Sequence, residues 1–269
     1  MPLLPQATHY CEPFGGSAAV LINRLPSPVE TYNDIHGDVV NFFRVLREQK
    51  DALIEAIGLT PFSRAEFEQA LTQSDTELSD LERARRFYIL ARQVRTGLAQ
   101  KASAGRWAHC LLTSRAGMAG AVSRWLGAVE DLPAIAQRLL RVQIENAPAL
   151  EVIKRYDSPE TLFYIDPPYP HDARGDANAY ANEMTDAQHR ELAAALRKVQ
   201  GKVAVSGYHC ELMDALYGAW QNIEAPEKMC HSVKTPRTEV LWINYKLEEH
   251  VQCQPSGRRQ PASQPTFLS

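Results

Sequence analysis

The segment TLFYIDPPYPHD, from Thr161 to Asp172, limits the possible fold more than any other stretch of the chain. Its first five residues are apolar, aromatic or β-branched, which is typical of a buried strand. An acid, two prolines and a tyrosine follow. Each proline fixes φ at about −65° and has no N–H to donate, so a sheet strand cannot continue through them. The pattern predicts a strand that ends in a stiff corner at Asp166.

Other segments with strand-like composition alternate with helical patterns along the chain. They are a short segment before Gly15 and residues 29–34, 141–146, 202–208 and 237–245. We expect the last of these to form a hairpin with a strand near His231–Lys234. Alternation of this kind predicts an α/β, Rossmann-like fold with a mostly parallel sheet and an antiparallel C-terminal hairpin strand.

The helical segments carry apolar stripes and capping signals. A helix is expected from about Ser17, and one long helix is expected from the spacing of Val39, Phe43, Leu46, Leu53 and Ile57. Further along the chain, Asn146 is expected to cap a helix that has Pro148 in its first turn. Thr185 and Gln188 match a capping box at the start of another helix.

The helical pattern is looser between the two strand-bearing parts of the chain. We therefore predict one α/β domain from residues 1–60 and 141–246, with a mainly helical subdomain, 61–140, inserted into it. Residues 247–269 are rich in Gln, Ser, Pro and Arg, which predicts a disordered tail.

Composition narrows the class of protein and its compartment. Five cysteines without C-x-x-C spacing argue against a disulfide framework or a zinc site, so no metal is expected and a reducing cytoplasm is favoured. No apolar run approaches the ~18 residues that span a bilayer. The first ten residues lack the features of a signal peptide.

Basic residues are concentrated in one stretch, although the net charge is only −3. Between Arg83 and Arg124 the chain has nine Lys or Arg and no Asp or Glu. One interpretation is a solvated helix face whose acidic partners lie elsewhere in the sequence. The other is a surface that contacts nucleic-acid phosphates, with Phe87, Tyr88 and Trp107 interleaved among the charges or buried in a core.

The segment EPFGGSAAV lies where the first predicted strand meets a helix. Glycines there allow close approach of the backbone to a ligand, although a tight structural turn explains them equally well. Asp34 ends the second strand, where acids of nucleotide-binding α/β folds accept hydrogen bonds from ribose hydroxyls, unless it serves the turn. The glycine turn contains neither a P-loop nor a G-x-G-x-x-G motif. The turn and Asp34 together therefore favour a ligand that has a nucleoside but no polyphosphate. S-adenosylmethionine matches that description.

The corner at Asp166 is rich in hydrogen-bond acceptors, because it presents a carboxylate and the Pro167 carbonyl. An exocyclic amine of a nucleobase offers two hydrogens to such acceptors. When the two acceptors hold both hydrogens, the nitrogen lone pair becomes available to attack a methyl sulfonium. Catalysis then depends mainly on aligning the two reacting groups. Tyr169 can stack on the base, and this contact contributes about 1–3 kcal/mol. It would help offset the free energy required to flip the base out of the duplex.

At these residues the sequence resembles the Dam-like, alpha-group adenine-N6 DNA methyltransferases, from Tyr10 to about Tyr245. The matching blocks are EPFGGSAAV, YNDIHGDVVNFFRVLRE, TLFYIDPPY, YANEMTDAQHRELAAAL, VAVSGY and RTEVLWINY. The resemblance implies methyl transfer from S-adenosylmethionine to N6 of adenine in double-stranded DNA. It makes residues 61–140 the target-recognition subdomain and leaves open a restriction endonuclease partner.

The resemblance also implies roles for individual residues. The catalytic corner is Asp166, Pro167, Pro168 and Tyr169. Cofactor-binding residues are Glu12, Phe14, Gly15, Gly16, Ser17, Asp34, Glu145, Asn146 and Asp166. DNA-binding residues are Arg83, Arg86, Arg92, Arg95, Lys101, Arg106, Arg115 and Arg174. Tyr180, Glu183 and His189 recur in the subfamily, and His189 is expected to serve packing or a phosphate contact.

One departure from the family pattern keeps alternatives open. The family usually has a Tyr/Trp-x-Gly-Gly-Lys block about twenty residues before the first glycine turn, and only thirteen residues precede Phe14 here. A catalytically silent DNA-binding remnant is one alternative. Methylation of RNA or of a protein amide is another, although those enzymes often have Asn where this chain has Asp166.

Overall fold

The computed structural model describes residues 3–72, 78–95, 99, 102–170, 183–225 and 238–247. They form two compact units. The sheet unit contains the described residues of Met1–Gly15, Arg24–Ile35 and Ala147–Gln260. The helical unit contains those of Gly16–Asn23 and His36–Asn146. The boundaries predicted at residues 60 and 140 stay predictions, as does the tail, of which residues 248–269 lie outside the described part.

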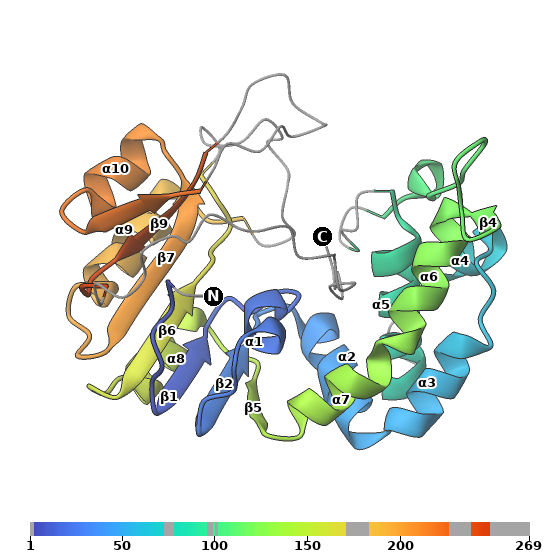
Figure 1. The fold of residues 1–269 in the computed structure, drawn as a ribbon, viewed down its shortest axis with the longest axis horizontal. Helices are drawn as coiled ribbons and strands as arrows, with labels where there is room; N and C mark the ends of the chain where they lie inside the picture. Colours follow the sequence, from blue (N-terminus) through green and yellow to red (C-terminus); the bar gives the residue numbers. More distant parts are fainter. Residues whose placement is uncertain are drawn as a thin grey trace. The chain divides into compact units, whose positions relative to one another are not determined.

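The sheet unit has its strands in the order β2-β1-β6-β7-β9-β8 (Figure 1). Strands β2, β1, β6 and β7 run parallel, and β9 is antiparallel to both β7 and β8. The strands are β1 His9–Glu12, β2 Val29–Asn33, β6 Thr161–Ile165, β7 Lys202–Tyr208, β8 Gln221–Glu224 and β9 Glu239–Ile243. This confirms the predicted α/β, Rossmann-like class with an antiparallel C-terminal strand.

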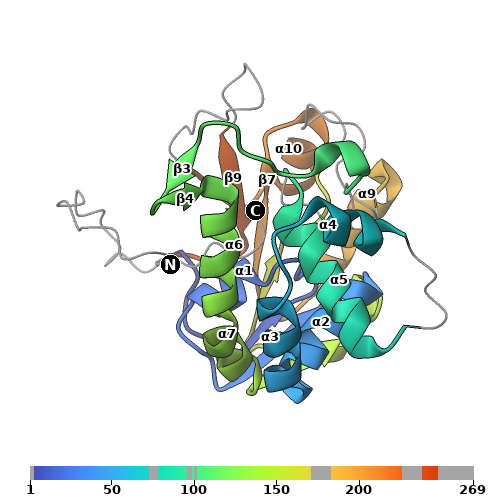
Figure 2. The same cartoon turned by 90° about the vertical axis from the view of Figure 1, so that its right-hand side faces the viewer.

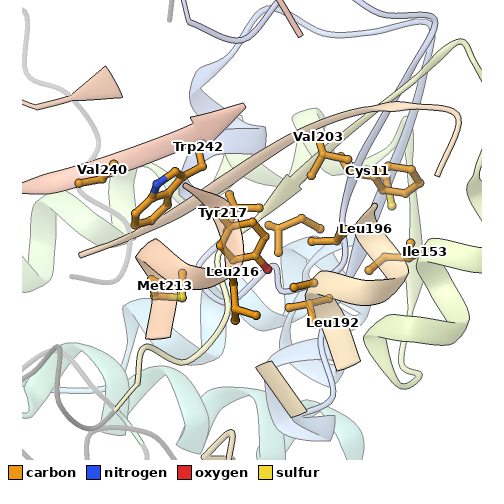
Figure 3. Close-up of a cluster of buried hydrophobic side chains, with 14 of the residues drawn as sticks. Cys11, Ile153, Leu192, Leu196, Val203, Met213, Leu216, Tyr217, Val240 and Trp242 are labelled. Atoms are coloured by element: carbon orange, nitrogen blue, oxygen red, sulfur yellow. The ribbon is translucent and has the colours of Figure 1, made fainter. Parts of the chain in front are cut away.

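Helices α8 (Ala149–Tyr156), α9 (Asp186–Leu196) and α10 (Glu211–Tyr217) belong to the same unit. Their apolar residues form a buried cluster with alternate residues of the strands, including Phe163 and Ile165 of β6. Figure 3 shows part of this cluster, in which residues of β1, β7 and β9 meet those of the three helices. Because side chains alternate along a strand, the intervening residues, such as Tyr164 and Ser206, face the opposite side of the sheet.

The helices of the helical unit are labelled in Figure 2, and several of them pack against one another through aromatic side chains. Phe42 of α2 stacks on Tyr88 of α5, with ring centroids 5.5 Å apart, and Tyr88 contacts Trp125 of α6. Phe87 and Tyr88 are both buried and are therefore core residues. The unit contains α1 Ala19–Asn23, α2 Gly37–Glu48, α3 Lys50–Gly58, α4 Arg64–Leu71, α5 Asp80–Gln93, the short 3-10 helix η2 Ala104–Arg106, β3 Ser114–Arg115, β4 Met118–Ala119, α6 Gly120–Glu130, α7 Leu132–Leu139 and β5 Val142–Glu145.

Two local expectations are wrong, and a third falls on residues outside the described part of the chain. The single long helix is two, because Gln49 leaves the helical conformation between α2 and α3, with φ −128°. The cap of α8 is Pro148 instead of Asn146, because helical conformation begins only at Ala149. The antiparallel neighbours of β9 are β7 and β8, while the partner predicted near His231–Lys234 lies outside the described residues.

Other local predictions are confirmed. Thr185 and Gln188 form the expected capping box of α9, with the Thr185 hydroxyl accepting the Gln188 backbone N–H. The hairpin of β3 and β4 was not predicted, because each strand has only two residues, too few to show an alternating pattern. Among the described residues, no helix is both long enough and apolar enough to span a bilayer.

Candidate active site

The parallel strands of the sheet unit bring several polar residues to one edge of the sheet. Strands β1, β2, β6 and β7 share a direction, so their carboxyl ends share an edge. Glu12 ends β1, Asp34 follows β2, Asp166 follows β6 and Tyr208 ends β7. In open α/β sheets this edge is where ligands bind. Three residues predicted for the site therefore meet here, and Tyr208 joins them.

The Asp166–Tyr169 corner is held by hydrogen bonds to a single carboxylate oxygen. The Tyr169 hydroxyl donates to Asp166 Oδ1 at 2.9 Å, and the Ser206 hydroxyl donates to the same atom at 2.7 Å. The Tyr169 ring meets Tyr208 edge-on, with centroids 5.1 Å apart and planes at 83°. Pro167 is buried and Pro168 is half-buried. The corner is thus stiff in its backbone and fixed in its side chains.

Opposing effects act on the protonation of the corner. Burial among protein atoms raises the pKa of Asp166, whereas the hydrogen bonds from Ser206 and Tyr169 lower it, and the net direction is upward. Asp166 is nevertheless exposed when the whole residue is considered, so solvent and ligands can reach it. Burial and the charges of Asp166 and Glu239 raise the pKa of Tyr169. Tyr169 therefore remains a neutral hydrogen-bond donor at physiological pH.

The glycine turn is anchored to the end of β2. The Gly15 N–H donates to the Asn33 carbonyl at 2.7 Å, and the Gly15 backbone lies against the Tyr32 ring, where a Cβ would collide with it. Asn33 donates through Nδ2 to Pro13 O at 2.8 Å and to Ala147 O at 3.0 Å, and accepts the Ala147 N–H at 2.9 Å. Gly15 is thus required by packing within the protein itself.

Glu12 and Phe14, which flank this turn, are partly committed to the protein interior. Glu12 is buried and accepts a hydrogen bond of 2.6 Å from the Tyr10 hydroxyl. Phe14 is half-buried and packs against the core cluster. Asp34 is half-buried at the end of β2. Of the two acids, Glu12 is buried, whereas Asp34 keeps part of its surface exposed.

Four of the predicted cofactor residues lie in the helical unit. Gly16 follows the turn with φ +48°, a conformation that favours glycine, and Ala18 shares it with φ 54°. Ser17 is half-buried between them. Glu145 ends β5 and is half-buried, while Asn146 is exposed. A non-glycine residue in this conformation is uncommon, and such strain often accompanies binding sites.

The arginines of the basic stretch fall into two groups. Arg83 pairs with Asp38 at 2.7 Å, and Arg86 pairs with Glu82 at 2.8 Å, so acids before the stretch neutralise them. Arg92 is half-buried on α5. Arg95, Arg106, Arg115 and Arg124 are exposed and form no ion pair with the described residues. Lys101 and Arg174 lie outside the described part of the chain.

The resemblance to the subfamily also named three positions outside the corner and the glycine turn. His189 is fully buried on α9, in agreement with a packing role. Glu183 is half-buried just before that helix. Tyr180 lies outside the described residues.

Sequence reasoning missed three residues that organise the site: Asn33, Ser206 and Tyr208. Asn33 is followed by Asp34, and such a pair is typical of a turn. Ser206 and Tyr208 lie two positions apart on β7, on the face opposite the core cluster, and this alternation could have been read from the sequence. Their proximity to Asp166 depends on the register of β6 and β7, which the sequence does not reveal.

Comparison with known proteins identifies the family. The model of the D12 class N6 adenine-specific DNA methyltransferases matches residues 1–231. The chain belongs to this family. Membership makes it a DNA adenine methyltransferase, and it agrees with the resemblance found from the sequence blocks. The match includes the glycine turn, Asp34, the whole helical unit and the Asp166–Tyr169 corner.

The other comparisons add little to the family assignment. No curated protein matches the methyltransferase chain. One similar solved structure is the rRNA methyltransferase aviRa from Streptomyces viridochromogenes, at 13% identity, over 89% of this chain and 78% of that one. Its TM-score of 0.37 is too low to support an argument about substrate or mechanism.

Proposed function

We propose that this methyltransferase moves a methyl group from S-adenosylmethionine to N6 of adenine in double-stranded DNA, with the target base flipped onto the Asp166–Tyr169 corner. The main support is the Asp166 carboxylate at the carboxyl edge of the sheet. It is oriented by two hydroxyl donors, and it belongs to a chain of the adenine-specific family.

The corner suits an amine better than it suits a carbonyl or a phosphate. The Asp166 carboxylate and the Pro167 carbonyl are acceptors, and the two prolines contribute no N–H donor. Adenine N6 carries two hydrogens and a lone pair that is delocalised into the ring. Holding the hydrogens favours a nitrogen geometry in which the lone pair is available to attack. As the N6–carbon bond forms, the carbon–sulfur bond breaks, and the extra proton on N6 passes to the Asp166 carboxylate or to water.

Tyr169 provides the surface on which the base rests in this proposal. Its ring is braced edge-on by Tyr208, which reduces the freedom that would be lost when a base stacks on it. Stacking on an aromatic side chain contributes about 1–3 kcal/mol. That is comparable with the few kcal/mol required to take a base out of a duplex.

The residues around the glycine turn fit S-adenosylmethionine. The donor set offers an acid, Asp34, for the ribose hydroxyls, and the turn is not a polyphosphate loop. We propose that Glu12, Phe14, Gly15, Gly16, Ser17, Asp34, Glu145, Asn146 and Asp166 contribute to cofactor binding. When bound, the cofactor supplies a methyl group on a positively charged sulfur. The acids Glu12 and Asp166 favour that charge by simple attraction.

We propose that residues 61–140 contact DNA mainly through the exposed arginines Arg95, Arg106 and Arg115. Exposed guanidiniums can release counterions from phosphates, whereas Arg83 and Arg86 are already neutralised by acids. Arg92, Lys101 and Arg174 remain proposed contacts. A restriction endonuclease partner and a cytoplasmic location are predictions of the same proposal.

A transfer assay tests the proposed reaction. The protein is incubated with methyl-labelled S-adenosylmethionine, a mixed-sequence DNA duplex and an equal mass of RNA, and the nucleosides are then separated. We expect the label in N6-methyldeoxyadenosine and none in RNA. Label on cytosine or on RNA contradicts the proposal. Absence of transfer together with calorimetric failure to bind the cofactor favours the catalytically silent alternative.

A further inference from the structure

Ser206 lies beside Asp166 because of the register of two parallel strands. Ile165, the last residue of β6, is the partner of Val205 on β7, so the next residues on each strand are Asp166 and Ser206. Ser206 is 3% exposed and occupies the face of β7 opposite the apolar cluster. A buried hydroxyl must find a hydrogen-bond partner, because leaving it unpaired is costly. Here the partner is the proposed catalytic carboxylate.

The hydrogen bonds at Asp166 are unevenly distributed between its two oxygens. Ser206 Oγ donates to Oδ1 at 2.7 Å, and its contact with the Ile165 carbonyl is longer, at 3.3 Å. The Tyr169 hydroxyl donates to Oδ1 as well, at 2.9 Å. Oδ2 accepts no hydrogen bond from the described residues. Two donors from different segments thus fix the rotation of the carboxylate and leave one oxygen open.

We propose that Ser206 is a positioning residue for methyl transfer, which holds Asp166 by Oδ1 so that Oδ2 accepts a hydrogen of the target amine. This role rests on the function proposed above. Positioning matters because small displacements of an aligned group reduce rates strongly. Tyr169 donates to the same oxygen, but its ring has a second proposed task as the stacking surface for the base.

Ser206 also favours the ionised form of Asp166, in which both carboxylate oxygens accept hydrogen bonds. Other titratable groups lie near the corner. They are Glu239 on β9 and Glu12 on β1, both acids, and the hydroxyls of Tyr164 and Tyr169. Burial raises the pKa of Asp166, and the hydrogen bond from Ser206 is the larger of the two that lower it. Removing the hydroxyl therefore raises this pKa further.

The chain offers a matched control for a lost buried hydroxyl. Thr161 starts β6, the strand that ends before Asp166, and is 1% exposed. Its hydroxyl donates to the Tyr156 carbonyl at 2.8 Å, at the opposite end of the strand from the corner. Thr161→Val removes a buried hydroxyl from the sheet unit without touching Asp166. Ser206→Thr keeps a hydroxyl at the tested position.

The kinetic test compares Ser206→Ala, Ser206→Thr and Thr161→Val with the wild-type enzyme. We expect Ser206→Ala to lower kcat roughly 10- to 100-fold, as loss of a hydrogen bond to a charged group does, with KM for DNA nearly unchanged. The acid limb of its kcat–pH profile moves to higher pH. Ser206→Thr restores both, and Thr161→Val changes neither. An unchanged acid limb in Ser206→Ala, or an equal fall in kcat in Thr161→Val, overturns the proposal.

A second readout separates this inference from the proposed reaction. The Asp166 carboxyl is followed by carbon-13 NMR during a pH titration of the cofactor-free protein, with Asp166→Asn assigning the signal. We expect Ser206→Ala to titrate at higher pH than the wild-type protein and Thr161→Val to titrate with it. Coincident titrations of Ser206→Ala and wild type overturn the positioning role. This result does not depend on which base is methylated.

Discussion

The sheet unit and the helical unit use polar side chains in different ways. At the carboxyl edge of the sheet, Asp166, Asn33 and Glu12 are each fixed by short hydrogen bonds to particular partners. In the helical unit, arginines such as Arg85 form partly buried ion pairs with several acids, whereas others such as Arg115 are exposed to solvent. The first arrangement aligns atoms, whereas the second provides charge.

This difference shows why a motif and a charge run carry different amounts of information. An Asp-Pro-Pro-Tyr segment specifies a backbone conformation and two acceptors wherever it occurs. A stretch of nine basic residues specifies only a local excess of charge, and three of them, Arg83, Arg85 and Arg86, are matched by acids before the stretch. The interpretation as a helix face with acidic partners elsewhere therefore holds for these three residues, and phosphate contact by the exposed arginines stays a prediction.

The largest stability effect is expected from a buried pair in the sheet unit. Arg24 lies 3.5 Å from Glu30, and both side chains are nearly or fully buried, at 3% and 0% exposure. Arg24 also covers the Tyr10 ring, and Glu30 accepts the Ser27 N–H. Glu30→Ala leaves a buried guanidinium without its carboxylate, so we expect a loss of about 3–5 kcal/mol in the free energy of unfolding. Denaturant unfolding measures this loss. A smaller loss for Glu30→Ala than for Arg85→Gln would contradict the comparison of the sheet unit with the helical unit.

A smaller effect is expected from the ion-pair cluster of the helical unit. Arg85 binds Glu82 through two nitrogens, at 2.7 and 2.9 Å, and Glu66 at 3.0 Å. Because these groups are partly exposed, we expect Arg85→Gln to cost about 1–2 kcal/mol at pH 7. The hydrogen bond from Arg85 is the main cause that holds the pKa of Glu82 below its ordinary value, so this contribution is fully present above that ordinary value and is lost as the pH falls. Denaturant titrations should show the difference from wild type shrinking as pH falls through the lowered pKa; a constant difference would contradict the assignment.

The smallest effect concerns an arginine that has no ion-pair partner among the described residues. Arg115, in the hairpin of β3 and β4, is exposed. We expect Arg115→Gln to leave unfolding unchanged and to reduce the slope of log K against log salt for DNA binding by about one. Arg85→Gln should leave that slope unchanged. If the two variants behave alike in the salt titration, the division of the arginines into structural and DNA-contacting groups is wrong.

Much of the sheet unit could be predicted from the sequence because its strands are short, apolar and bounded by turn residues. The strand before Asp166, the strand ending at Asn33 and the capping box at Thr185 follow from local rules. The site also depends on register, which brings Ser206 to Asp166 across forty residues, and no local pattern contains that information. The helical unit was predicted only in outline, because Gln49 interrupts a continuous apolar stripe without a Pro or Gly to announce it.

The most direct test of the account replaces the carboxylate that grips the amine. Single-turnover formation of N6-methyldeoxyadenosine in a DNA duplex is measured by mass spectrometry for wild type, Asp166→Asn and Asp166→Ala. We expect Asp166→Ala to be slower by about 10²–10³-fold or more, a loss comparable with removal of one polar group from a catalytic site. Asp166→Asn keeps one acceptor oxygen, so its rate should lie between those of wild type and Asp166→Ala. Thermal unfolding and DNA binding should stay close to wild type. Transfer by Asp166→Ala at the wild-type rate would contradict the account.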